Sequence, residues 1–102
     1  MSVRKIKSSE FDGVIAAGGK VLVDFYTDWC GPCRMVAPVV AEVANERADV
    51  TFLKVNVDEE GELAKSFGIY SIPTLVVIEG GREVRRASGA KRKEGILELL
   101  GS

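Results

Sequence analysis

The sequence has 102 residues, which favours one domain, and we expect a single domain over residues 1–102. Its hydrophobic content of 46% and charged content of 28% are ordinary globular values, enough for one core. The net charge of −1 gives no overall field that would favour nucleic acid or a membrane surface as a partner. The apolar stretches are strand-sized, whereas a membrane-spanning helix needs about 20 residues.

The first residues, Met1 to Lys7, carry charges but lack the apolar segment of a secretory signal. We therefore expect the protein to work in the cytoplasm, where thiols are kept reduced. In that compartment a lone pair of cysteines is more often catalytic or metal-binding than a structural crosslink.

The first half of the chain predicts two strands and two helices in alternation. A short apolar-polar alternation at residues 3–6 predicts a first strand, and Ser8 or Ser9 is expected to cap the helix that follows. The β-forming run at 21–26 is nearly unbroken, which is typical of a central strand buried on both faces. An apolar stripe at helical spacing predicts a helix over residues 30–48.

The second half predicts five further elements and one tight turn. They are a strand at 51–57, a short helix at 59–66, a strand at 74–78, a hairpin turn at Gly80-Gly81, a strand at 82–87 and a helix at 91–100. Helices separate the earlier strands, and a hairpin and a helix end the chain. This order predicts an α/β fold, with a central mixed five-stranded sheet flanked by four helices on both faces.

Cys30 and Cys33 are the two cysteines of the chain and lie in the motif Trp-Cys-Gly-Pro-Cys. Residues three apart on a helix are neighbours, roughly 5–6 Å between Cβ atoms. A disulfide needs Cα atoms about 4.4–6.8 Å apart. A first helical turn can therefore hold both sulfur atoms within bonding distance whether they are reduced or oxidised, which a two-electron redox cycle requires.

The sequence contains no His. This excludes Cys–His and Ser–His hydrolases, His-based zinc sites and haem attachment, for which His would replace Arg34 after the second Cys. A structural zinc ion takes four Cys or His ligands and this chain offers two, so a metal could only be shared between two chains of a dimer. Redox chemistry is the favoured interpretation, and a dimeric metal-bridging module is the alternative.

The sequence resembles the thioredoxin family nearly from end to end. The matching segments are Val23-Asp24-Phe25, Trp29-Cys30-Gly31-Pro32-Cys33, Ala37-Pro38, Lys54, Val57-Asp58, Ile72-Pro73-Thr74 and Gly89-Ala90. The Gly-Pro spacer is that of the family's reductants, whereas isomerases and periplasmic oxidants usually carry His between the cysteines. Tyr26-Thr27 departs from the Trp-Ala of many members, which we expect to alter packing and fluorescence more than chemistry. Tyr70-Ser71, ahead of Ile72, is a second departure.

The resemblance implies a thiol–disulfide oxidoreductase that reduces disulfides in client proteins and carries no cofactor of its own. An NADPH-dependent thioredoxin reductase would supply the electrons, and the protein would act as a monomer. Implied clients include ribonucleotide reductase, peroxiredoxins and methionine sulfoxide reductase. A non-enzymatic binding subunit that uses the same fold as a scaffold is an alternative.

Cys30 is the expected nucleophile, because free N–H groups and the positive end of a helix favour a thiolate where the helix begins. Cys33, one turn further in, is the expected resolving thiol. Asp24 interrupts an apolar run, so burial should raise its pKa and suit it as a general base that acts through a water molecule. The alternative is that Asp24 faces solvent. Lys54 is a similar intrusion in the next strand and could pair with Asp24, whereas an edge-exposed Lys54 would have no role.

The resemblance also implies a cis peptide bond before Pro73, lying against the disulfide. An apolar docking surface around Cys30 would then bind an extended client segment. Its expected members are Trp29, Gly31, Pro32, Ile72, Pro73, Gly89 and Ala90, although Trp29 could instead be an ordinary core residue. The basic residues from Arg82 to Lys93 are interpreted as a solvated face, with the alternative that Lys91 and Arg92 steer acidic partners.

Overall fold

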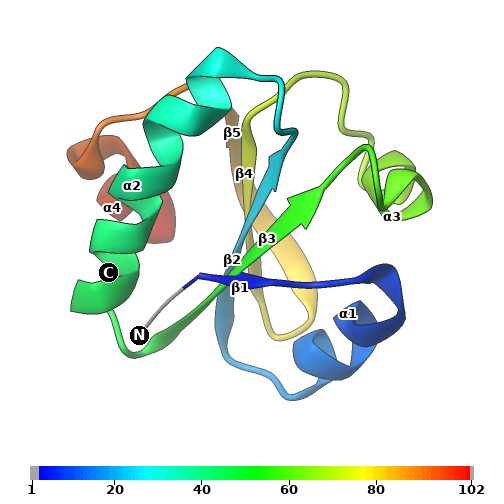
Figure 1. The fold of residues 1–102 in the computed structure, drawn as a ribbon. Coiled ribbons are helices and arrows are strands. Elements are labelled where there is room, and N and C mark those ends of the chain that lie inside the picture. The colour runs from blue at the N-terminus through cyan, green and yellow to red at the C-terminus, as the bar shows by residue number, and fades with distance from the viewer. Residues whose placement is uncertain (1–2, 102) are drawn as a thin grey trace.

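The structure, a computed structural model, describes residues 3–101. Its strands are β1 (Arg4–Lys5), β2 (Lys20–Tyr26), β3 (Val50–Asn56), β4 (Thr74–Glu79) and β5 (Arg82–Ser88). Its helices are α1 (Ser8–Ala16), α2 (Gly31–Glu46), α3 (Gly61–Ser66) and α4 (Lys93–Leu100). The strands form one sheet in the order β1-β3-β2-β4-β5 (Figure 1). Strands β1, β3 and β2 are parallel to one another, β4 is antiparallel to β2, and β5 is antiparallel to β4. The predicted α/β fold is confirmed.

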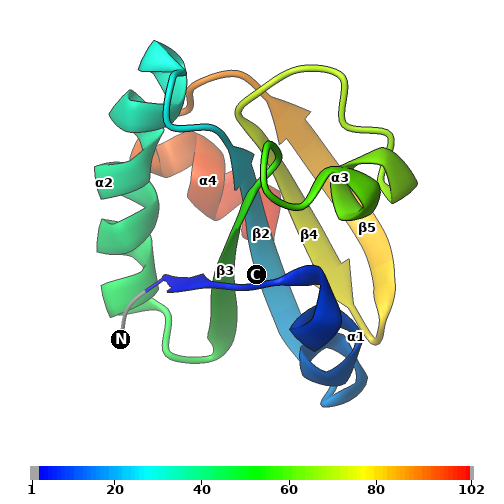
Figure 2. The same cartoon turned by 45° about the vertical axis from the view of Figure 1, so that its right-hand side comes forward.

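Alternation along β2 divides the core into two layers. Leu22 packs with α2 and α4 on one face of the sheet, while Val21, Val23 and Phe25 pack with α1 and α3 on the other. Figure 2 shows the two pairs of helices on opposite sides of the strands. Each fully buried large side chain contributes about 1.5–3 kcal/mol, so both faces of this central strand stabilise the fold.

The expectation that Ser8 or Ser9 caps α1 is wrong. Lys7 is the N-cap residue, and its backbone N–H donates to the Glu10 carboxylate at 3.1 Å. The backbone N–H and the hydroxyl of Ser8 both donate to Oε1 of Glu60, at 2.9 and 2.8 Å. The first turn is therefore satisfied by carboxylates, one of them far away in the sequence.

The helix boundaries differ from those predicted, by up to two residues at the ends that moved. Cys30 is the N-cap of α2 instead of its first residue, and the helix ends at Glu46 because Arg47 turns to bind Asp49 at 2.9 Å. At the hairpin, Gly80 and Gly81 have φ values of 61° and 82°, the left-handed values that both central residues of a type I′ turn need. The predicted hairpin is confirmed.

The topology brings the ends of several strands and the start of one helix to the same edge of the sheet. The parallel strands β2 and β3 both end there, α2 begins there, and the antiparallel strand β4 starts there (Figure 1). This edge therefore collects residues from four separate segments of the chain. Among the helices of residues 3–101, none has the length and apolar character needed to cross a membrane.

Candidate active site

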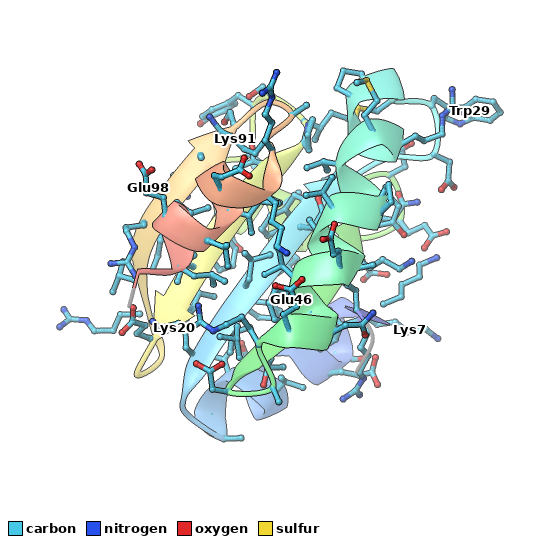
Figure 3. All side chains as sticks on the ribbon, turned by 90° about the vertical axis from the view of Figure 1, so that its left-hand side faces the viewer. Lys7, Lys20, Trp29, Glu46, Lys91 and Glu98 are labelled. Atoms are coloured by element: carbon cyan, nitrogen blue, oxygen red, sulfur yellow. A yellow bond between two sulfur atoms is a disulfide. The ribbon has the colours of Figure 1, made fainter. Side chains whose placement is uncertain are left out.

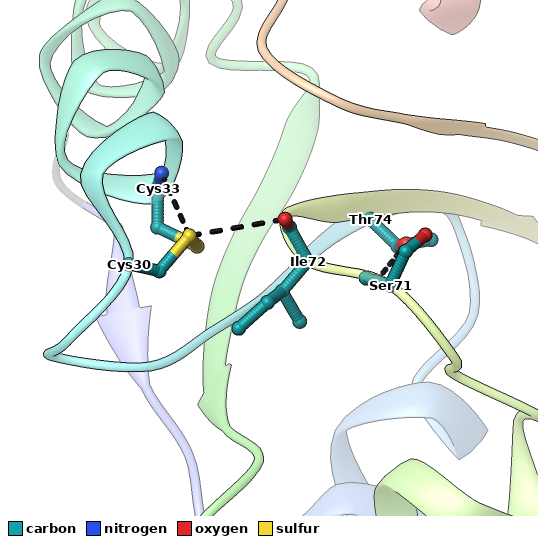
Figure 4. Close-up of a disulfide and its surroundings, with 5 residues drawn as sticks. All are labelled: Cys30, Cys33, Ser71, Ile72 and Thr74. Carbon is teal, nitrogen blue, oxygen red and sulfur yellow. Dashed lines mark hydrogen bonds between the residues drawn. A yellow bond between two sulfur atoms is a disulfide. The ribbon is translucent and has the colours of Figure 1, made fainter.

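A disulfide joins Cys30 to Cys33 at the start of α2 (Figure 4), with their Cα atoms 5.2 Å apart. Gly31 and Pro32 form the first helical positions between them. Proline is tolerated there because the first N–H groups of a helix have no partner inside it, and its fixed φ already suits the helix. The Gly-Pro spacer therefore begins the helix at the position that brings the two cysteines together.

The backbone around Cys30 suits a negative charge on its sulfur. The Cys33 N–H donates to the Cys30 Sγ at 3.1 Å, so the N-cap side chain satisfies one of the free donors of the helix. The 16-residue helix adds a positive dipole end, about half an elementary charge. Cys30 is half-buried, whereas Cys33 is 3% exposed. An incoming disulfide can thus reach Cys30 more readily than Cys33.

The loop before β4 lies against the disulfide. The Cys30 Sγ is 3.8 Å from the carbonyl oxygen of Ile72, and the Ile72–Pro73 bond is cis, as the family resemblance implied (Figure 4). The buried Thr74 hydroxyl donates to the Ser71 carbonyl at 2.6 Å and meets the Ser88 hydroxyl at 3.0 Å. Thr74 thereby ties the loop to the end of β5, a role that sequence reasoning did not assign to it.

A second tie joins the loop to the segment after β5. The Gly89 N–H donates to the Pro73 carbonyl at 2.8 Å. Gly89 has a φ of 90°, in the left-handed region that favours glycine. The two segments predicted to form one docking surface are thus hydrogen-bonded to each other.

Asp24 is a buried carboxyl group below the disulfide. The residue is 4% exposed, and its Oδ1 has no hydrogen-bond partner among the described residues. Burial raises the pKa of Asp24 to about 6, although the positive charge of Lys54 works against this rise. The alternative of a solvent-facing Asp24 is therefore wrong.

Lys54 lies directly across the ladder from Asp24 and is half-buried. The two side chains form no ion pair in the described part of the chain, and Lys54 affects Asp24 through its field. Both residues line a pocket of about 150 Å³ that also reaches Cys33. A pocket of this size has room for water, which could carry a proton between Cys33 and Asp24.

The sequence matches a known protein family over nearly its whole length. The family model for thioredoxin matches residues 2–102. A thioredoxin of Chlamydia pneumoniae is 45% identical over 98 residues, covering 96% of this chain and 95% of the relative. The chain belongs to the thioredoxin family. It is a thiol–disulfide oxidoreductase, and Cys30 and Cys33 are its redox-active pair.

Two further comparisons agree with this assignment. A solved thioredoxin of Plasmodium falciparum superposes with a TM-score of 0.91 at 34% identity, covering 96% of each chain. A bifunctional thioredoxin reductase/thioredoxin of Mycobacterium leprae is 43% identical over 101 residues, which are 98% of this chain and 22% of that protein. Thioredoxin-family proteins work with a thioredoxin reductase and with disulfide-containing clients.

Most residues of the expected docking surface are accessible in this thioredoxin-family chain. Trp29 is 89% exposed and points away from α2 (Figure 3), so the alternative of a core tryptophan is wrong. The members differ in burial: Gly31, Pro32 and Ala90 are exposed, Ile72 and Gly89 are half-buried, and Pro73 is buried. Two further large side chains, Met35 and Tyr70, are 70% and 97% exposed, and sequence reasoning did not predict the exposure of either.

Asn56 is a second polar residue that sequence reasoning left without a role. Its side chain is 2% exposed, and its Oδ1 accepts hydrogen bonds from the N–H groups of Asp58 and Glu59 at 2.9 and 3.3 Å. Its Nδ2 donates to Asp28 at 3.4 Å, just before Trp29. The sequence contains a signal for this burial, because an Asn between two valines in a β-forming run is as unusual as Asp24 in its own run.

Three basic residues between Arg82 and Lys93 form ion pairs or hydrogen bonds with other elements. Arg85 donates to Glu79 and to the last carbonyls of α4, Arg86 to Glu83 and the Phe67 carbonyl, and Lys93 to Glu42 and Glu46. These three residues connect separate elements of the fold and therefore have a structural role. Arg92 is exposed, and Lys91 lies at the same end of the molecule as the disulfide (Figure 3).

A metal site of three or more ligands is not formed by the part of the chain that the structure describes, since no three His, Cys, Asp or Glu side chains gather there. The chemistry that the site can perform with its own residues is dithiol–disulfide exchange.

Proposed function

We propose that Cys30 is the nucleophile, Cys33 the resolving thiol and Asp24 the general base of a protein-disulfide reductase. The Cys30 thiolate attacks one sulfur of a client disulfide, so a mixed disulfide forms and the other client sulfur leaves as a thiolate. Cys33 then gives its proton to Asp24 through water and attacks the Cys30 sulfur. The second client thiolate is released, and two electrons have moved from the protein to the client.

The hydrogen bond from the Cys33 N–H to the Cys30 sulfur is the observation that carries this proposal. A thiol with an ordinary pKa of about 8.5 is only about 3% ionised at pH 7, whereas one near 7, the value typical of thioredoxins, is about half ionised. A much lower pKa would not help, because the nucleophilicity of a thiolate falls with its pKa.

The accessible residues around Cys30 are proposed as the client-binding surface. A client segment in extended conformation would pair with the backbone of Ile72, as in strand addition, and would lie over Trp29, Pro32 and Ala90. Lys54 is proposed to moderate the pKa of Asp24 through its charge. A flat apolar surface with few specific contacts suits a reductant that serves many clients weakly.

The electron donor is proposed to be an NADPH-dependent thioredoxin reductase. The fused relative from Mycobacterium leprae, whose name joins the two activities, supports this pairing. A reductant needs a compartment that keeps its thiols reduced, so we place the protein in the cytoplasm. One chain carries the dithiol, the base and the docking surface, which supports a monomer with residues 1–102 as one domain.

Coupled turnover tests the direction of electron flow. With NADPH, a thioredoxin reductase and insulin, we expect continuous NADPH oxidation that depends on this protein. The reduction potential should lie at about −270 mV, as is typical of the family. A potential near about −120 mV, typical of oxidants, or near about −180 mV, typical of isomerases, would contradict a reductant.

Lys91 and Arg92 are proposed to steer acidic partners towards the disulfide. Reversing both charges with Lys91→Glu and Arg92→Glu should slow insulin and reductase turnover about 3- to 10-fold at 10 mM salt, because long-range attraction becomes repulsion. The difference should vanish near 1 M salt, where the screening length is about 3 Å. Arg82→Glu is the control for Arg92→Glu, because Arg82 is an exposed arginine on the distant hairpin. Unchanged rates at low salt would contradict steering and support the interpretation of these residues as a solvated face.

A further inference from the structure

Tyr26 shares a face of the sheet with the buried carboxyl group. Side chains alternate along a strand, so Asp24 and Tyr26 of β2 point to one side, as do Lys54 and Asn56 of β3. In the parallel ladder Asp24 is opposite Lys54, and Tyr26 is opposite Asn56. Four polar or amphipathic side chains are thus gathered where both strands end, beneath the first turn of α2.

Lys54 is close to two groups that can interact with its positive charge, the Asp24 carboxylate and the Tyr26 ring. Its ammonium lies near the ring. The Lys54 Nζ is 5.9 Å from the centroid of the Tyr26 ring, within the range of a cation–π interaction. Asp24 Oδ1 is buried without a hydrogen-bond partner, although Lys54 is its neighbour across the ladder. Among the described residues, the Lys54 ammonium therefore lies near the Tyr26 ring and makes no hydrogen bond to Asp24 Oδ1.

One pocket is lined by the residues that take part in the proposed proton transfer from Cys33. Asp24, Tyr26, Lys54 and Cys33 line the pocket of about 150 Å³. The other charged side chains that line it are Asp28 and Arg34, and the β4 residue opposite Asp24 is the apolar Leu75. Lys5 of β1 lies opposite Lys54 in the ladder and interacts electrostatically with Tyr26. Among the described residues, Lys54 is the charge that acts on the pKa of Asp24, and it lowers that pKa against the effect of burial. Its position is therefore what sets the basicity of the carboxyl group beyond burial.

We propose that Tyr26 is a positioning residue for the resolving step: its ring holds the Lys54 ammonium away from Asp24, so the carboxyl group stays basic enough to accept the proton of Cys33. This inference rests on the proposed role of Asp24 as general base. It adds a chemical role for the ring of Tyr26, for which the sequence predicted effects on packing and fluorescence.

Removing the ring while keeping an apolar side chain tests the proposal. In Tyr26→Leu, Lys54 is free to approach Asp24, and we expect the Asp24 pKa to fall by about 1, measured by carbon NMR of the carboxyl group in the oxidised protein. Tyr26→Phe is the matched control, because it keeps the ring and loses only the hydroxyl. Its Asp24 pKa should stay at the wild-type value, and an equal fall in Tyr26→Phe would overturn the role of the ring.

The Lys54→Met background separates this effect from a general change in packing. Without the cation, Tyr26→Leu should no longer lower the Asp24 pKa. A fall of the same size in that background would mean that Tyr26 acts through burial, and the proposal would be wrong. In the wild-type protein, the ε-methylene protons of Lys54 should show an upfield ring-current shift. If the Lys54 ε-methylene protons show no such shift, the ammonium does not lie over the ring and the proposal is wrong. This measurement needs only the wild-type protein, so it holds even if Tyr26→Leu does not fold.

The pH profile of mixed-disulfide resolution links this pKa to the reaction. In Tyr26→Leu the midpoint of that profile should move to lower pH together with Asp24, and Tyr26→Phe should leave it in place. An unchanged Asp24 pKa would overturn the positioning role of Tyr26. A lowered pKa with an unmoved profile would instead overturn Asp24 as the general base, and with it the catalytic part of this inference.

Discussion

Cys30→Ser is expected to abolish disulfide reduction, with a loss of at least about 10³-fold in insulin turnover. The alcohol that replaces the thiol is not ionised at neutral pH, and Cys33 cannot substitute because it is 3% exposed. Cys33→Ser should fail differently. Cys30 still attacks, the resolving thiol is missing, and one client molecule stays covalently attached to each protein molecule.

Non-reducing electrophoresis and intact mass would measure the adduct, and thiol treatment should release it. The double variant Cys30→Ser/Cys33→Ser is the control and should form none. A stable adduct in Cys30→Ser with none in Cys33→Ser would reverse the two roles. Full biological function in Cys30→Ser would support the alternative of a binding subunit for which redox chemistry is incidental.

Asp24→Asn is expected to stabilise the protein at neutral and alkaline pH while slowing its turnover. The folded-state pKa of Asp24 is about 6 and its ordinary value is 3.8. A carboxyl group with a raised pKa favours the folded state below about pH 4, and this contribution is lost as the pH rises through 6. The difference between the two pKa values corresponds to about 3 kcal/mol in the free energy of unfolding. The neutral amide of Asp24→Asn does not ionise, so the variant does not lose this stability as the pH rises.

Urea unfolding of the oxidised proteins from pH 4 to pH 8 measures this difference. The stability advantage of Asp24→Asn should grow across that range and level off above pH 7. Asp49 is the opposite case: hydrogen bonding to Arg47 lowers its pKa to about 2, and its contribution is lost as the pH falls through that value. Asp49→Asn should therefore give no gain at neutral pH, and a flat difference for Asp24→Asn would contradict a buried carboxylate.

Kinetics give the second half of the Asp24 prediction. Loss of the base should slow resolution of the mixed disulfide by about 10- to 100-fold at pH 7, with little change in the first attack by Cys30. Rapid-quench analysis of the mixed disulfide separates the two steps. An equal slowing of both steps would mean that Asp24 affects the whole site and not the proton of Cys33.

The fold was predictable because its signals are local. An almost unbroken β-forming run identified the central strand, and a Gly-Gly pair identified the hairpin. The burial of Asp24 was predictable for the same reason, since one charge stood among apolar neighbours. The redox pair was the favoured interpretation from the spacing of Cys30 and Cys33 together with the absence of His, with a metal shared between two chains as the alternative.

What the sequence did not reveal depends on partners distant in the chain. Ser8 does not cap α1 because Glu60 reaches its N–H and hydroxyl across 52 positions. Asn56 also reaches Asp28, and Thr74 also reaches Ser88, side chains that only the folded sheet brings near. The place of the Lys54 ammonium over Tyr26 is likewise a choice between two neighbours that a linear pattern cannot rank.

The pKa of the Cys30 thiol is the decisive measurement for the proposed mechanism. Alkylation of the reduced protein by iodoacetamide, followed from pH 5 to pH 10, gives the pKa of the reactive sulfur. We expect a value of about 7 at Cys30, since the helix start and the Cys33 N–H stabilise its thiolate, with Cys33 reacting far more slowly. An ordinary value of about 8.5 at Cys30, or faster alkylation of Cys33, would contradict it.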